Sequence, residues 1–161
     1  MEDLQKEKEE LIEMFGIHFE SIYNVPPLAA RIMGLLILDG CKQGLTFEDI
    51  VTKIGASKSS VSTNLHLLLN SERIYYHTFA GDRRKYFKAA PFSNRLANYI
   101  KVINHEKELI DKLTIYRSQT MSCKQESHNL EHAKAYKSYV QNIEDILLKS
   151  IEEFKEIEKK S

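Results

Sequence analysis

The sequence predicts a mainly helical (α+β) fold that contains one small β-hairpin. Apolar residues recur every three or four positions over most of the 161 residues, which is the spacing of amphipathic helices. Aromatic and β-branched residues are concentrated between residues 73 and 88, on both sides of a Gly81-Asp82 turn. The chain has only three prolines and no Gly/Ser-rich or Pro-rich linker, so we expect it to be compact.

Pro26-Pro27 separates the first two predicted helices. The first runs from the start of the chain to this pair, and its apolar stripe consists of Leu4, Leu11, Ile12, Phe15, Phe19 and Ile22. Because proline fits the first turn of a helix, Pro26-Pro27 also opens the second helix, which ends at Asp39-Gly40. The dense apolar content of the second helix indicates that it is buried.

Two shorter helices are predicted next. Thr46 is the expected N-cap of the third helix, with Asp49 three residues later in an Asp variant of the capping box. Gly55-Ala56 forms a turn, and Ser57 caps the fourth helix. The buried face of the fourth helix is expected to consist of Val61, Leu65 and Leu68.

A two-stranded β-hairpin is predicted after the fourth helix. Its strands are Arg73–Phe79 and Lys85–Lys88, joined across the Ala80-Gly81-Asp82 turn. A helix, a turn, a second helix and then a hairpin make a winged helix-turn-helix. In that fold one helix enters the major groove of DNA, and the hairpin, called the wing, reaches the backbone beside it. The order of elements therefore points to DNA binding.

The candidate DNA contacts lie on the fourth helix and at the tip of the wing. Short hydroxyl side chains let a helix approach a groove closely, and a lysine at the helix start lies beside the phosphates. An ordinary solvated helix carries the same residue types, so the basic wing is what favours DNA. There the acidic Asp82 can hold an arginine in position. The predicted DNA-binding residues are Ser57, Lys58, Ser59, Ser60, Ser62, Thr63, His66, Arg83, Arg84 and Lys85.

Charge is unevenly distributed along the chain. The net formal charge is zero, which argues against non-specific coating of nucleic acid. Residues 41–90 contain eight basic and four acidic residues, a formal charge of +4, so the remainder sums to −4. A basic middle between acidic helical ends suits a protein whose centre meets phosphate and whose ends meet protein.

Two long helices are predicted after Pro91, over residues 94–121 and 126–159. With the first helix, they present more apolar surface than one small winged domain can cover, so pairing with a second copy is expected. An intramolecular helical hairpin is the alternative. A two-fold dimer would bind a palindromic operator. The predicted dimerisation residues are Leu11, Phe15, Val140, Ile143, Leu147 and Phe154.

The length of the chain fits a single domain. Residues 1–24 are expected to form the N-terminal dimerisation helix, and residues 25–90 the winged helix-turn-helix. Residues 91–161 are expected to form the C-terminal helices, which serve dimerisation and are the candidate region for effector binding.

Three segments of the chain resemble the GbsR branch of the MarR-type regulators. They are Asn24–Leu36 with its Pro-Pro helix start, Ser57–Ser62, and the wing segment Gly81–Phe87, and they occur in family order. The resemblance implies a dimeric bacterial transcriptional regulator, usually a repressor, whose DNA affinity can be changed by a small ligand. It places the start of the recognition helix at Ser57–Thr63. It also makes Asp82 with Arg83 or Arg84 the wing pair, with one arginine reaching the minor groove.

Other classes of protein find little support in the sequence. The histidines fall into no recognised catalytic motif, so an enzyme is not expected, and neither a cofactor nor a metal is expected. The N-terminus is acidic and lacks the apolar segment of a signal peptide, and the longest apolar run is too short to span a bilayer. Two distant cysteines, Cys41 and Cys123, are typical of a reduced cytoplasmic protein, here one associated with the nucleoid when bound to DNA.

Two alternative functions stay open at this point. Cys123, His128 and His132 could form a metal- or thiol-responsive switch, because the two histidines are four residues apart and share a helix face. Alternatively, the winged helix could bind a protein partner without binding DNA.

Overall fold

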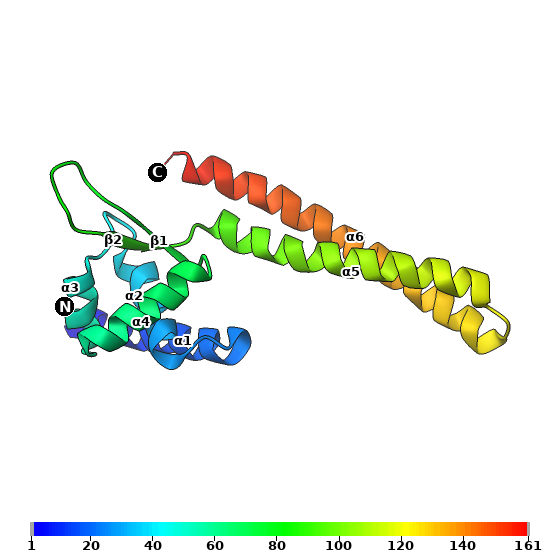
Figure 1. Cartoon of the computed structure of the whole chain (residues 1–161), viewed down its shortest axis with the longest axis horizontal. Coiled ribbons are helices and arrows are strands. Elements are labelled where there is room, and N and C mark those ends of the chain that lie inside the picture. The colour runs from blue at the N-terminus through cyan, green and yellow to red at the C-terminus, as the bar shows by residue number, and fades with distance from the viewer. Residues whose placement is uncertain (1, 161) are drawn as a thin grey trace. The chain divides into compact units, whose positions relative to one another are not determined.

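The computed structural model describes residues 2–160, which form six helices and two strands (Figure 1). The predicted fold class, mainly helical with a two-stranded wing, is confirmed. The helices are α1 Glu2–Tyr23, α2 Pro27–Asp39, α3 Phe47–Ile54, α4 Lys58–Asn70, α5 Phe92–Thr120 and α6 Lys124–Glu158. The strands are β1 Ile74–His77 and β2 Tyr86–Ala89.

The chain divides into two compact units, residues 1–90 and residues 91–161. The first contains α1 to α4 and the wing, and the second is the hairpin of α5 and α6. The division falls where the sequence separates the winged helix-turn-helix from the C-terminal helices. The assignment of the whole chain to one domain stays a prediction.

The helices of the first unit begin at the predicted residues. Pro26 is the N-cap of α2, and Pro27 is its first residue. Thr46 and Asp49 form the predicted capping box of α3, in which Thr46 Oγ1 accepts from Asp49 N at 3.1 Å and Asp49 Oδ2 accepts from Thr46 N at 2.9 Å. Ser57 Oγ accepts from Ser60 N at 3.2 Å and caps α4. These caps pair backbone N–H groups that have no partner within their helices.

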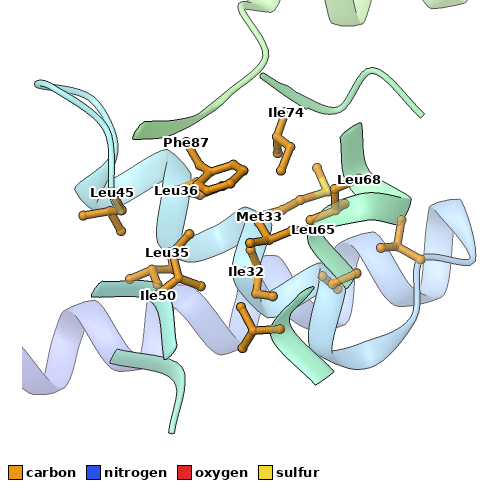
Figure 2. Packing of buried hydrophobic residues seen from close by; sticks show 14 of the residues in the cluster. Ile32, Met33, Leu35, Leu36, Leu45, Ile50, Leu65, Leu68, Ile74 and Phe87 are labelled. Atoms are coloured by element: carbon orange, nitrogen blue, oxygen red, sulfur yellow. The ribbon is translucent and has the colours of Figure 1, made fainter. Parts of the chain in front are cut away.

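The core of the first unit surrounds α2, as predicted from its apolar content. Five consecutive residues of this helix, Ile32–Leu36, are buried, and the four apart from Gly34 are at most 4% exposed. Figure 2 shows the core side chains converging on α2 from α3, α4 and the wing. Its other labelled contributors are Leu45, Ile50, Leu65, Leu68, Ile74 and Phe87.

The wing strands are four residues each and pair antiparallel, with Ile74 opposite Ala89 and His77 opposite Tyr86. The sequence predicted a longer first strand, Arg73–Phe79, and a second strand one residue earlier, Lys85–Lys88. The difference arises because residues 78–85 form a loop of their own, in which Asp82 N donates to Phe79 O at 3.0 Å. A single bridge between Leu45 and Phe87 ties the segment before α3 to β2.

Helix α1 packs closely against α2 at a glycine. A Cβ atom added at Gly34 would lie 3.0 Å from Phe15 Cβ and 3.1 Å from the carbonyl oxygen of Ile12. Phe15, one of the predicted dimerisation residues, packs against the core here and is only partly exposed. The absence of a Cβ atom at Gly34 therefore sets the distance between the two helices.

Asp39, the last residue of α2, joins three helices. Its Oδ2 accepts from Lys8 Nζ of α1 at 2.8 Å and from Lys53 Nζ of α3 at 2.9 Å. Burial alone would raise the pKa of this carboxyl, but the two lysines outweigh that effect and the pKa is lowered. The ion pairs therefore also offset the repulsion of a negative charge at a helix C-terminus.

In the second unit α5 and α6 lie side by side and antiparallel (Figure 1). Phe154 of α6 stacks on Phe92 of α5 at 5.4 Å between ring centroids, and Glu158 accepts from Ser93 N at 3.1 Å. Lys107–Glu144 and Lys137–Asp111 ion pairs cross between the helices. The most buried apolar residues between the helices are Ile110, Leu130, Ala133, Val140 and Ile151.

We expect Gly34→Ala to destabilise the first unit by about 1 kcal/mol or more, because the new methyl group overpacks a rigid contact with the α1 backbone. Gly16→Ala is the matched control, since its Cβ would meet only the flexible Arg31 side chain at 3.1 Å and alanine favours the helix. Urea unfolding measures both. Equal stability of the two variants would contradict the close packing at Gly34.

The Asp39 ion pairs predict a pH dependence of stability. The pKa of Asp39 is lower in the folded chain than in the unfolded chain, so its contribution is complete above the unfolded pKa, about 4. The contribution is lost as the pH falls through the lower, folded value. Asp39→Asn should cost about 1 kcal/mol at pH 7 and less at pH 3, since the ion pairs are partly solvated. Thermal unfolding of the wild type and the variant across pH is the measurement. If this assignment is wrong, the stability difference between the two proteins will be the same at every pH.

Candidate nucleic-acid interface

The orientation of α4 is set by its apolar face. Val61, Leu65 and Leu68 are at most 3% exposed and anchor the helix to the core around α2. The opposite face is therefore turned to solvent. All seven predicted DNA contacts on this helix and its cap are exposed, namely Ser57, Lys58, Ser59, Ser60, Ser62, Thr63 and His66.

Several of these hydroxyl groups are bonded within the chain. Ser57 Oγ lies 3.1 Å from Ser59 Oγ and donates to Ser60 Oγ at 2.8 Å. Thr63 Oγ1 donates to the carbonyl oxygen of Ser59 at 3.0 Å. These four residues shape the start of the helix, and their hydroxyl groups are already engaged before any ligand arrives.

Three residues on α4 differ from that group. Within residues 2–160, Lys58, Ser62 and His66 make no side-chain hydrogen bond and no ion pair. Asn64, a half-buried neighbour, was not among the predicted DNA-binding residues. Its Nδ2 donates to the carbonyl oxygen of Ser60 at 2.8 Å. Asn64 is a residue type that reads adenine, which was the signal for considering it.

The tip of the wing is organised by Asp82, as predicted. Arg84 Nε lies 3.0 Å from both carboxylate oxygens, and Arg84 Nη2 lies 2.6 Å from Oδ2. The Tyr86 hydroxyl donates to the same Oδ2 at 2.8 Å. The hydrogen bonds from Arg84, followed by that from Tyr86, hold the pKa of Asp82 far below its usual range. The partner of Asp82 is thus Arg84 and not Arg83.

Aromatic side chains pack together at the base of this loop. Phe79 packs edge-on against His77 and Tyr86, with ring centroids 5.0 Å and 4.9 Å apart, and His77 stacks on Tyr86 at 5.9 Å. Sequence analysis used these residues only as strand formers. Their spacing on a short hairpin was the available signal, because alternate residues of a strand share a face.

The remaining basic residues of the wing are differently placed. Lys85 Nζ lies 4.2 Å from the centre of the Tyr76 ring, a cation–π contact. Arg83 is exposed and has no hydrogen-bond or ion-pair partner in the part of the chain that the structure describes. The tip therefore combines one arginine held by a carboxylate with one that is available to an anion.

The predicted dimerisation residues fall into two groups. Leu11 is 38% exposed on α1, whereas Val140 has no exposed surface in the single chain. Ile143, Leu147 and Phe154 are half-buried. Part of the apolar row on α6 is thus covered by α5, which is the alternative that the sequence left open, and the dimer itself stays a prediction.

The three residues of the alternative switch lie near the start of α6. Cys123 is its N-cap residue, and the rings of His128 and His132 are 5.0 Å apart between centroids. Over residues 2–160, no three His, Cys, Asp or Glu side chains are grouped so that they could hold a metal ion. The described helices also include none that is long and apolar enough to cross a membrane.

No protein-family model matches the chain. The chain is 37% identical over 83 residues to the HTH-type transcriptional regulator MmpR5 of Mycobacterium tuberculosis. The match covers 51% of the chain and 48% of MmpR5, so the chain spans about half the length of this curated relative.

A solved structure described as a transcriptional regulator is similar over nearly the whole chain. It has 25% sequence identity and a TM-score of 0.61, and the match covers 93% of this chain and 99% of that one. MepR of Staphylococcus aureus, a transcription regulator of the multidrug efflux pump MepA, is more distant. Its identity is 18% and its TM-score 0.42, with 83% and 91% of the two chains covered. The likenesses to MmpR5 and to the first solved structure are therefore likenesses to transcriptional regulators, not to enzymes. The chain has a winged helix-turn-helix fold and is similar, in sequence and in fold, to transcriptional regulators.

Proposed function

We propose that the chain is a DNA-binding transcriptional regulator that represses transcription by binding a palindromic operator as a homodimer. The observation that carries this proposal is the pairing, in one compact unit, of an exposed polar face on α4 with a basic wing tip that is already ordered. A helix of this kind fits the major groove, and such a tip fits the adjacent backbone or minor groove. Similarity to MmpR5 and to the solved regulator supports the proposal.

The two wing arginines take different roles in this proposal. Arg84 is bound bidentately by Asp82, so it shapes the loop and presents only part of its charge. Arg83 is the exposed cation beside it and is the arginine that contacts the phosphates or the minor groove. Lys85, held over Tyr76, adds a second positive charge near the backbone.

The proposed dimer contact lies on one flank of the α5–α6 hairpin. On each helix, several apolar residues beside the buried row are at least 40% exposed. We define this apolar flank as Tyr99, Val102, Leu109, Leu113 and Tyr116 of α5 with Tyr136, Tyr139 and Ile146 of α6. The opposite flank carries mainly polar and charged residues, among them Lys101, Glu108, Lys134 and Asp145. A contiguous exposed apolar surface of this kind marks a contact with another protein surface.

Both helices contribute to the same side of the hairpin. The Tyr136 hydroxyl of α6 donates to Glu106 of α5 at 3.1 Å, beside Leu109 and Leu113. A second copy offers the matching surface, because a two-fold contact uses the same patch on both chains. Pairing would join two hairpins into a four-helix bundle.

The finer assignments belong to this proposal as well. They are the GbsR branch of the MarR-type regulators, a small-molecule effector bound by the C-terminal helices, and action in the cytoplasm on the nucleoid. The metal- or thiol-responsive alternative would rest on His128, His132 and Cys123, but two adjacent histidines supply only two of the four ligands that a structural zinc site uses.

Fluorescence anisotropy tests the proposed function directly. The full chain is titrated with a duplex from upstream of its own gene and with a scrambled duplex, at several salt concentrations. We expect tight, sequence-selective binding that weakens steeply with salt. Equally weak binding to both duplexes would instead favour a winged helix that binds a protein partner.

Changes at the two arginines should separate their roles. Arg83→Ala should weaken binding to all sequences and reduce the salt slope by about one, because one phosphate contact is lost. Arg83→Lys should keep most of the affinity, whereas Arg84→Lys should lose affinity, since lysine cannot replace the bidentate bond to Asp82. Lys101→Ala, on α5, controls for net charge. An Arg83→Ala variant with wild-type affinity and slope would contradict the assignment.

The apolar flank predicts the behaviour of charged variants. Leu109→Glu and Tyr139→Glu should give monomers in light scattering and weaken operator binding at least tenfold, because a single half-site is bound weakly. Ile115→Glu is the matched control, since Ile115 is 59% exposed on the opposite flank. Ile143 and Leu147 are unsuitable for this test because both are half-buried within the hairpin. Dimers in all three variants would place the contact elsewhere, with α1 as the next surface to test.

A further inference from the structure

We infer that the operator half-site presents guanine to a row of three side chains on α4. The row consists of Lys58, Ser62 and His66. This inference rests on the proposed function and names the base that the recognition helix reads.

The geometry sets these residues apart from the rest of the helix. They are spaced at i, i+4 and i+8, so they follow one line along the helix, beside the buried face of Val61, Leu65 and Leu68. All three are exposed, and within residues 2–160 the polar atoms of their side chains have no hydrogen-bond partner. Two of them lie in the first two turns of α4, the part of a recognition helix that meets base edges.

The neighbouring side chains of Thr63 and Asn64 already form hydrogen bonds with the backbone of α4. The hydroxyl of Thr63 donates to the backbone of Ser59, and the amide nitrogen of Asn64 donates to the backbone of Ser60. Asn64 is also half-buried, so its carboxamide is not available for the bidentate bond by which asparagine reads adenine. No aspartate or glutamate occurs in α4, so no carboxylate accepts from the amino group of cytosine.

The row is rich in hydrogen-bond donors. A lysine ammonium only donates, and a serine hydroxyl and an imidazole each supply a donor. In the major groove guanine presents two acceptors, N7 and O6. Thymine presents one acceptor beside a methyl group, adenine one acceptor and one donor, and cytosine a donor. Guanine is therefore the base whose edge the three side chains complement together. A lysine at a helix start can also bind phosphate, and the experiment separates these two roles.

The test begins by selecting duplexes that bind the purified full chain from a random pool. Each guanine of the selected half-site is then replaced, one at a time, by 7-deazaguanine, which pairs with cytosine normally but lacks the N7 acceptor. We expect a half-site with guanine at two or more fixed positions, and at least one replacement that weakens wild-type binding about fivefold or more.

Variants assign the contact to the row. The variants are Lys58→Ala, Ser62→Ala and His66→Ala. One of them lacks the donor that contacts the critical guanine. In that variant, replacing this guanine by 7-deazaguanine should not weaken binding further. His105→Ala and Lys101→Ala, on α5, are matched controls that should respond as wild type does. Circular dichroism checks the fold of each variant.

The outcomes distinguish the inference from the proposed function. A selected half-site without a fixed guanine would overturn the inference, as would a 7-deazaguanine effect that is equal in wild type and in all three variants. In both cases sequence-selective binding, and with it the proposed function, would stand. Failure to enrich any sequence would overturn the proposed function and the inference together.

Discussion

The burial of α2 is the constraint on which the first unit depends. Five consecutive residues, Ile32–Leu36, are nearly inaccessible to solvent, so this helix must be covered on every side. It is covered by α1 across Gly34, by α3 and α4, and by Phe87 of the wing. The polar face of α4 points outward because its other face has been used for this purpose.

The wing rests on a second constraint, which is electrostatic. Its loop is too polar to join the core, and Asp82 organises it instead through Arg84 and Tyr86. A loop that is ordered in advance loses little conformational freedom when it meets a duplex, so less of the contact energy is spent on ordering it. The hydroxyl network at Ser57 has the same effect on the first turn of α4.

Local signals in the sequence were enough to predict most of the fold and of the site's location. Pro27, the Thr46–Asp49 capping box and Ser57 fix helix starts through contacts only a few residues apart. The choice between Arg83 and Arg84 could not be predicted, because both adjoin Asp82 and the loop backbone decides which one reaches it. It could not be predicted either whether α5 or a second chain covers the apolar row of α6. The spacing of Val140 and its neighbours is the same whether α5 or a second chain covers them.

The low pKa of Asp82 has a consequence for how the proposed regulator would respond to acidity. The carboxylate stays ionised far below neutral pH, so Arg84 and Tyr86 keep their anchor when the surroundings become acidic. The Asp82 contacts that shape the wing tip are therefore kept in mild acid. Any effect of mild acid on a promoter controlled through this tip would therefore have to arise from groups other than Asp82.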